Sequence, residues 1–382
     1  MRGKEDRMMK RALRLTALAV AGVLLFTALA GCSGKSKATG DKALPTIKIA
    51  MIVEDAVRPA LVVAADTLGY YKEEGVNVEF VSVDSPLSGL SAVETGKADI
   101  FPFSVTALSF IARGSDTAFI AGTATEGSSL VVSRKWLDVD FRDFSNFKGK
   151  TIGRNPRSPI SYLLIQYIKA HNPEYTDEGY TTWLDFDDNN VLLEAINKGT
   201  VDGGILVTER VWLAEERGLK EAFDLAEFLP EYLCCRQATT LKAISEKRDV
   251  LKAVLRAQIR AENDYKNSTD KVVNAVVGWT QVKKEYVIRY IATEKNYYST
   301  GLTKFRNPVS VNPLYNKIVE YYRVGQEMGL YKPEPDVVLK DHIDLSIYED
   351  ALNELIQRYP DNQTYQEMYK IFKVSSSDYW EV

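Results

Sequence analysis

One ten-residue pattern occurs twice in this chain of 382 residues. Leu90–Asp99 reads LSAVETGKAD, and Leu193–Asp202 reads LEAINKGTVD. The pattern predicts a helix that ends at a glycine, because glycine adopts the left-handed conformation after the last turn without a Cβ penalty. Each copy precedes an apolar stretch of strand length and then a hydroxyl residue that can begin a helix, Ser104 or Thr208. The repeat therefore predicts two similar α/β lobes, although a chance match between two short helix ends is the alternative.

The N-terminus has the features of an export signal. Basic residues precede the apolar run Leu15–Leu29, which is too short to span a bilayer comfortably. The run closes on Leu-Ala-Gly-Cys, which resembles a bacterial lipobox and makes Cys32 the expected site of lipid attachment. We therefore expect residues 1–31 to be a lipoprotein signal peptide and 32–44 to be a flexible tether. The protein would then be lipid-anchored at the extracytoplasmic face of the cell membrane, in the periplasm or on the cell surface.

The composition excludes several classes of function. The chain carries a formal net charge of −4 and has no dense Lys/Arg cluster, so a nucleic-acid partner is not expected. The chain has two histidines, too few to favour a histidine-based metal site or a catalytic triad. Apart from Cys32, the cysteines are the neighbours Cys234 and Cys235, which cannot form a long-range disulfide framework. We expect a monomer without metal or cofactor.

Strand-like and helical patterns alternate along most of the chain, which predicts mostly parallel sheets flanked by helices. Lobe 1 begins at residues 45–131, lobe 2 is expected at 132–235, and 236–382 is expected to hold the remainder of lobe 1 and C-terminal helices. The expected strands of lobe 1 are Thr46–Val53, Val76–Val83, Ile100–Phe103 and Thr117–Gly122, and the long helices expected after the second lobe are Leu241–Tyr265 and Lys271–Tyr290.

Three segments resemble one known family. They are Gly69–Glu79 (GYYKEEGVNVE), the repeat copy Leu90–Asp99, and Phe147–Gly153 (FKGKTIG). Together with the lipobox, they resemble the substrate-binding lipoproteins of ABC importers in the SsuA/THI5-like branch (nitrate, sulfonate, taurine, thiamine-pyrimidine), also called NMT1-like. The resemblance covers about residues 45–335. It implies a two-lobed type II periplasmic-binding-protein fold, with two crossing strands and a helical C-terminal extension.

The same resemblance implies a function. Such a protein captures a small nutrient, anionic or heterocyclic, between its lobes and delivers it to a permease with its ATPase. In open α/β sheets, ligands bind beyond the carboxyl ends of the strands, where helix N-termini present free N–H groups. The ligand-binding residues expected there are Arg58, Ser85, Ser104, Thr125, Arg157, Ser158, Tyr162, Trp183, Thr208 and Arg236. Helix capping alone would explain the serines, and core packing would explain the aromatic residues.

The segment Cys234–Gln237 is expected to re-enter lobe 1 as the second crossing strand. Alternation along a strand would place Cys235 and Gln237 on one side, and Cys234 and Arg236 on the other. We expect Arg236 to face the ligand, because a charge in a hinge is costly without a partner. The alternative is an ion pair with a nearby Asp or Glu. The cysteines are expected to be free thiols.

Two other functions remain open at this point. The first is an enzyme related to the eukaryotic pyrimidine synthase of the same fold. That synthase needs a cysteine-rich iron motif and a histidine-dependent site, whereas Cys234–Gln237 has no third cysteine or adjacent histidine. The export signal also argues against it, so we expect no enzyme activity. The second is a sensor domain that presents a ligand to a signalling partner.

Overall fold

The computed structural model describes residues 43–382 except 104, 157, 177–178, 295–307 and 381–382. The chain divides into a unit of residues 1–43 and a unit of residues 44–382. The predicted signal peptide, most of the tether and Cys32 therefore lie outside the described residues. Within the described part, no helix combines the length and the apolar character that a membrane span needs. The remainder of this section concerns the second unit.

Lobe 1 is built on short strands that are linked by isolated bridges. Strands β1 and β2 pair in parallel, and β3 and β9 pair antiparallel. Ile100 bridges to β1 and Phe101 bridges to β9, so this short segment joins the two pairs. The elements are β1 (Thr46–Met51), α2 (Ala60–Thr67), α3 (Tyr70–Glu73), β2 (Asn77–Ser82), α4 (Pro86–Glu94), α5 (Ala107–Ile111), β3 (Thr117–Thr125), β9 (Leu233–Thr240), α9 (Leu241–Asn267), α10 (Thr269–Thr280), α11 (Lys284–Ile291), α12 (Tyr315–Glu327), α13 (Ser346–Arg358), α14 (Gln363–Ser375) and α15 (Ser377–Trp380).

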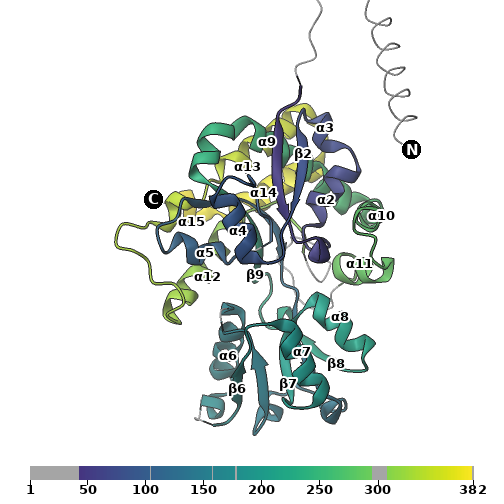
Figure 1. Ribbon diagram of the computed structural model, residues 1–382, viewed down its shortest axis with the longest axis vertical. Coiled ribbons are helices and arrows are strands. Elements are labelled where there is room, and N and C mark those ends of the chain that lie inside the picture. Colours follow the sequence, from purple (N-terminus) through teal and green to yellow (C-terminus); the bar gives the residue numbers. More distant parts are fainter. Residues whose placement is uncertain (1–42, 104, 157, 177–178, 295–307, 381–382) are drawn as a thin grey trace, which may run out of the picture. The chain divides into compact units, whose positions relative to one another are not determined.

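Lobe 2 is a five-stranded sheet with the order β6-β5-β7-β4-β8. Strands β6, β5 and β7 are parallel, whereas β4 runs antiparallel to both of its neighbours. Figure 1 shows α6, α7 and α8 around this sheet. The elements are β4 (Ser128–Val132), β5 (Thr151–Arg154), α6 (Pro159–His171), β6 (Thr182–Asp185), α7 (Asn189–Lys198), β7 (Gly203–Val207), α8 (Thr208–Glu216) and β8 (Lys220–Asp224), and short 3-10 turns join several of them.

Alternating side chains of lobe 2 build a core on each face of its sheet. Leu130 and Val132 of β4 belong to a cluster that includes Leu164 of α6. Val131, between them, belongs to a second cluster with Ile196 of α7. This is the period of two that a strand buried on both faces requires. The α/β fold class expected from the sequence is confirmed.

Several expected elements differ in extent. Ile100–Phe103 is not a strand, because it makes only the two isolated bridges. The helix expected at Lys271–Tyr290 is two helices, α10 and α11, and Gln281 between them has a positive φ of 57°. The chain passes from one sheet to the other at two places. The first is near residues 126–127, between β3 and β4, and the second is near residues 231–232, between β8 and β9. The lobe boundaries at 131/132 and 235/236 stay a prediction.

The two repeat copies make the same backbone and side-chain contacts. Gly96 and Gly199, which follow α4 and α7, both have a φ of 70°, as the left-handed helix end requires. Asp99 accepts a hydrogen bond from the backbone N–H of Lys48, and Asp202 accepts one from Thr151, each at 2.8 Å. Lys48 is in β1 and Thr151 begins β5, so each aspartate fastens its helix end to a strand of its own lobe.

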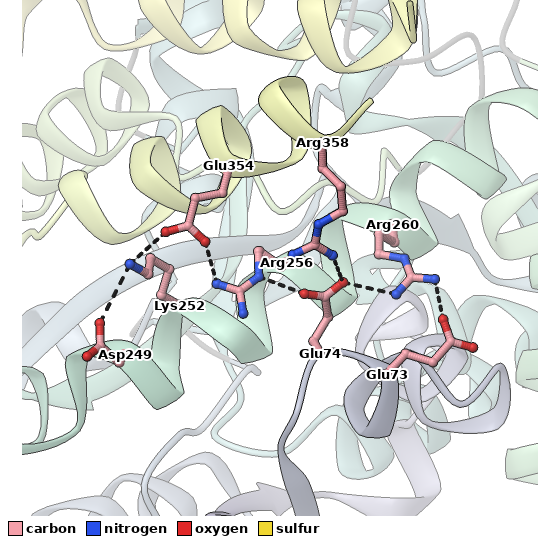
Figure 2. Close-up of polar contacts among 8 residues, drawn as sticks. All are labelled: Glu73, Glu74, Asp249, Lys252, Arg256, Arg260, Glu354 and Arg358. Atoms are coloured by element: carbon pink, nitrogen blue, oxygen red, sulfur yellow. Dashed lines mark hydrogen bonds and ion pairs between the residues drawn. The ribbon is translucent and has the colours of Figure 1, made fainter. Parts of the chain in front are cut away.

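The C-terminal helices pack on lobe 1 through a network of ion pairs (Figure 2). Glu74 lies just after α3, in the segment Gly69–Glu79, and its side chain is 1% exposed. It accepts hydrogen bonds from Arg256 and Arg260 of α9 and from Arg358 of α13. Burial raises the pKa of Glu74, but the hydrogen bonds from these arginines outweigh burial and leave the pKa lowered. The network thus ties the family-like segment to the C-terminal extension.

Two glutamates hold the crossing points together. Glu126 and Glu231 both have positive φ values, 63° and 58°. The N–H of Glu231 donates to Oε1 of Glu126 at 2.8 Å, and the N–H of Glu126 donates to the carbonyl of Tyr232 at 3.0 Å. A non-glycine residue in this region costs about 1–3 kcal/mol unless its surroundings hold it there. The reciprocal bonds supply such surroundings at the junction between the lobes.

Candidate functional site

Arg236 is deeply buried beside the crossing points, with 1% of its surface exposed. Its Nη1 donates to the carbonyl oxygens of Cys235 at 2.6 Å and Ala124 at 3.2 Å. Its Nε and Nη2 have no hydrogen-bond partner among the described residues. Burial lowers the pKa of Arg236 to about 10. The ion pair with a neighbouring Asp or Glu that was the alternative is absent from the described part of the chain.

The neighbours Cys234 and Cys235 bring their sulfurs together instead of alternating. Their Sγ atoms lie 3.2 Å apart, and both are free thiols, as expected. The cause is the register of β9 against β3, in which Ala124 pairs with Cys235 but Thr125 pairs with Leu233. Cys234 is therefore an extra residue in β9, a β-bulge that turns its side chain out of the regular alternation. The expectation of opposite faces for the two cysteines is wrong for this reason.

Arg58 forms an ion pair across the lobes. It follows β1 in lobe 1, and its Nε and Nη2 contact Oε1 and Oε2 of Glu209 at 2.5 and 2.7 Å. Glu209 is the second residue of α8 in lobe 2, and its side chain is 6% exposed. Burial would lower the pKa of Arg58, but the carboxylate of Glu209 outweighs burial and raises it. Arg58 is thus engaged by the protein itself.

Aromatic side chains from α11 and α12 complete the surroundings of the two cysteines. Tyr321 of α12 is buried and hydrogen-bonds Ser158, the residue before α6 in lobe 2. Tyr286 of α11 lies against Trp212 of α8, with ring centroids 5.6 Å apart. Burial raises the pKa of Tyr286 and Tyr321, so both phenols stay neutral at ordinary pH. Each of these two tyrosines therefore connects a helix of lobe 1 with lobe 2.

The other predicted residues are placed as follows. Ser85 caps α4, because its side chain accepts the N–H of Ser88 at 3.2 Å. Thr125 ends β3 and its hydroxyl contacts the carbonyl of Pro308 at 3.4 Å, and the hydroxyl of Thr208 donates to the carbonyl of Gly127 at 3.0 Å. Tyr162 is half-buried in α6, and Trp183 lies in the edge strand β6 with its ring stacked on Phe147. Ser104 and Arg157 lie outside the described residues.

A separate open pocket lies at the carboxyl ends of β1 and β2. Its volume is about 610 Å³, and its lining includes Glu54, Asp84, Ser88 and Lys97. Residues that follow these two strands, among them Glu54 and Asp84, contribute to it. Acidic groups outnumber cations in its lining, so it lacks the charge that an anion would need.

No cluster of three or more metal-ligating side chains occurs among the described residues.

A family model described as "NMT1/THI5 like" matches residues 59–270, more than half of the chain. The chain belongs to the NMT1/THI5-like family. No curated protein matches the sequence.

Solved structures with this fold include binding proteins of import systems. The nitrate-binding protein NrtA of Synechocystis PCC 6803 is 11% identical, with a TM-score of 0.63 over 82% of this chain and 89% of that chain. A zinc-bound ligand-binding component of an ABC-type import system from Staphylococcus aureus is 15% identical, with a TM-score of 0.62 over 80% and 99%. The aliphatic sulphonate-binding protein SsuA of Escherichia coli is 13% identical, with a TM-score of 0.60 over 80% and 99%.

The desulfurization enzyme DSZB also shares the fold, with 13% identity and a TM-score of 0.55. At these identities the likeness of this NMT1/THI5-like chain to solved structures concerns its fold.

The residues that the sequence did not point to are Glu209, Tyr286 and Tyr321. Glu209 directly follows Thr208, which the sequence analysis names as a ligand-binding residue. An acidic residue in the first turn of a helix is ordinary, since it complements the helix dipole, so its identity gave no sign of a partner in the other lobe. The two tyrosines are on helices that follow residues 59–270, the segment that the family model matches. Nothing in the sequence of these helices indicates which face turns toward lobe 2.

Proposed function

We propose that this chain is an extracytoplasmic solute-binding lipoprotein that holds a small anion between its lobes and delivers it to an ABC importer permease. The observation that carries the proposal is the state of Arg236. Its guanidinium is buried, no carboxylate of the described residues accompanies it, and two of its nitrogens are unused. Fold and family membership support a solute-binding role in general. The buried positive charge of Arg236 supports a solute that is negatively charged.

The two unused nitrogens are suited to one kind of group. Nε and Nη2 of Arg58 hold both carboxylate oxygens of Glu209, which is the side-on fork of an arginine–carboxylate pair. The same two atoms, Nε and Nη2, are the unused ones in Arg236. A carboxylate, sulfonate or phosphate group would occupy them with the same geometry. It would also supply the countercharge without which a buried cation is costly.

The position of Arg236 fits capture between lobes. It lies in β9, directly after the second crossing point, and its Nη1 contacts the carbonyl of Ala124 in β3, the strand that leads to the first. Ser158, Thr208 and Glu209 of lobe 2 make contacts near the same junction. An anion on Arg236 would therefore lie where both crossing segments and both lobes can respond to it.

Thermal shift and calorimetry test the proposal. The full chain would be screened with nitrate, sulfate, methanesulfonate, taurine, acetate and pyrimidine phosphates, with neutral pyrimidines for comparison. A ligand at 100 times its dissociation constant stabilises the folded state by about 2.7 kcal/mol. Arg236→Gln should reduce the affinity for the anion at least tenfold, and Arg323→Gln, which alters an arginine with 61% of its side chain exposed, should not.

Two results would contradict this reading. One is equal anion affinity in the parent and in Arg236→Gln, and the other is binding of neutral pyrimidines alone. Recovery of the bound compound separates a binding protein from an enzyme, since a binding protein returns it chemically unchanged. Uptake of the compound by cells with and without the chain separates delivery to a permease from signalling, because only delivery makes uptake depend on the chain.

A further inference from the structure

The bulge in β9 places two thiols beside Arg236 in a position that the proposed binding role does not use. Their sulfurs lie 3.2 Å apart, whereas side chains of neighbouring residues in a regular strand point to opposite faces. Cys235 is buried and its thiol donates to the carbonyl of Phe103 at 2.9 Å. Cys234 is half-buried, so it is the less enclosed residue of the pair.

The surroundings favour a reactive Cys234. The hydrogen bond with Cys235 lowers the pKa of the Cys234 thiol, and the positive charges of Arg58 and Arg236 lower it further. Burial and the carboxylate of Glu209 oppose the shift, but the pKa remains lowered. The pKa of Cys235 is raised, first by the same hydrogen bond and then by burial. The thiolate is the nucleophile in thiol–disulfide exchange, so Cys234 is the sulfur that would attack and Cys235 the one that would follow.

We propose that Cys234 and Cys235 form a redox-active pair that a low-molecular-weight disulfide converts into a disulfide between the two neighbouring residues. The Cys234 thiolate attacks one sulfur of the reagent RSSR, forms a mixed disulfide and releases RS⁻. Cys235 then gives up its proton and attacks the Cys234 sulfur, which expels the second RS⁻. The protein loses two thiol protons and two electrons, and the reagent becomes two RSH.

Geometry predicts that this disulfide is easily reduced again. Neighbouring Cα atoms are about 3.8 Å apart across a trans peptide, whereas disulfides usually join Cα atoms about 4.4–6.8 Å apart. Strained disulfides have less negative reduction potentials and are the labile ones. The pair would therefore follow the redox state of its surroundings instead of acting as a permanent cross-link.

Oxidation would affect two hydrogen bonds that Cys235 makes in the reduced protein. The Cys235 thiol would lose the proton that it donates to the carbonyl of Phe103. The backbone carbonyl of Cys235 accepts a hydrogen bond from Nη1 of Arg236 at 2.6 Å, and the cross-link would be formed by this same residue. Both changes weaken native contacts in β9, so we expect the oxidised protein to melt at a lower temperature than the reduced one. If the proposed function holds, the same change alters the anion site, and this last consequence alone rests on it.

Intact-mass spectrometry tests the pair directly. The full chain with Cys32→Ser, which removes the remaining cysteine, would be incubated with oxidised and reduced glutathione at several ratios, quenched with acid, unfolded and alkylated. We expect a species that resists alkylation at both cysteines and is about 2 Da lighter than the reduced protein. Its conversion should be reversed by reduced glutathione. Retention of two alkylated cysteines at every ratio, or a disulfide between two chains, would overturn the proposal.

Single substitutions separate the roles of the two sulfurs. Cys235→Ser should stop at the glutathione adduct of Cys234, whereas Cys234→Ser should leave the buried Cys235 unmodified while folded. Equal adduct formation on both variants would show independent thiols and reject the pair. The melting temperature should fall on oxidation in the parent and stay unchanged in Cys234→Ser. These readouts need no ligand, so they stand even if Arg236→Gln shows that no anion binds.

Discussion

Asp99 accepts a hydrogen bond from the backbone N–H of Lys48 at 2.8 Å, across 51 residues of sequence. Asp202 and Thr151 repeat this bond with the same length and the same separation of 51 residues. The repeated aspartate therefore has the same structural function in both lobes, which is to fasten the end of a helix to a strand of its own lobe. A chance match between two helix ends would not reproduce a long-range contact.

Replacing these aspartates should destabilise the two lobes to a similar extent. Asp99→Ala and Asp202→Ala each leave a strand N–H without its acceptor, at an expected cost of about 1–3 kcal/mol. Urea unfolding followed by circular dichroism measures the change. Lys247→Met is the control for Asp99, because it removes the ion pair of Lys247 with Asp99 and keeps the backbone hydrogen bond. Unfolding curves that coincide with the parent would show that the repeated aspartate is dispensable.

Removing the charge of Glu74 should weaken the packing of the C-terminal helices. Glu74→Gln takes away a buried partner of Arg256, Arg260 and Arg358, and we expect a loss of about 1.5–3 kcal/mol, the range of hydrogen bonds to charged groups. Glu73→Gln is the matched control, since Glu73 is 56% exposed and contacts Arg260 alone in this network (Figure 2). Equal losses in the two variants would contradict a special role for the buried carboxylate.

The same carboxylate predicts a pH dependence. The pKa of Glu74 is lower in the folded protein than its usual value of 4.5, so the unfolded chain binds the proton more readily. Its contribution to stability is therefore complete above about pH 4.5 and is lost as the pH falls through the lowered pKa. Denaturation curves at a series of pH values should show a smaller acid loss in Glu74→Gln than in the parent. An identical acid loss in both proteins would refute this assignment.

Breaking the pair between Arg58 and Glu209 should separate the lobes. Arg58→Met or Glu209→Gln leaves a buried group without its partner, and separation of the lobes would return that group to water. Small-angle scattering should report a larger radius of gyration for each single variant than for the parent. The double variant, Arg58→Met with Glu209→Met, should lie closer to the parent because neither member of the pair stays charged, and what remains lost is the longer contact of Arg58 with Asp55 at 3.6 Å. Superimposable scattering curves for all four proteins would argue against a latch between the lobes.

The membrane anchor can be tested without reference to the fold. Cys32→Ser removes the expected lipid attachment site, which the sequence places in a tether outside the core. The variant should leave the washed membrane fraction while its melting temperature stays that of the parent. Retention of the variant in the membrane as firmly as the parent would reject the lipoprotein proposal.

Local signals in the sequence predict local structure well here. Ser85 and Asp188 cap α4 and α7, and the glycines that end these helices have the expected positive φ. Contacts between segments that are distant in the sequence were harder to predict. The fork of Arg58 finds its acceptor in the other lobe, and nothing near Glu209 in the sequence indicates this. The bulge at Cys234 depends on how β9 aligns with β3, and no pattern within β9 determines that register.

Arg236 shows how far a physical argument from sequence can reach. The cost of burying a charge at the hinge predicts that it needs a partner, and the alternative was a neighbouring carboxylate. The structure removes that alternative among the described residues, since two of its nitrogens are unused. Under the proposed function, the identity of the ligand would depend on more than Arg236, and Tyr286 of α11 and Tyr321 of α12 connect lobe 1 with lobe 2. Those helices lie beyond the segment that the family model matches, residues 59–270.

The C-terminal extension also protects a strand edge. Ile343 bridges β3 in parallel at Phe119, and the N–H of Asp344 donates to the carbonyl of Phe119 at 2.9 Å. A chain that ended at Leu330 would leave this backbone edge without a partner, together with the apolar surface of α9 that α13 covers. Uncovered edges pair with other chains. Premature truncation of this protein is therefore expected to produce aggregates.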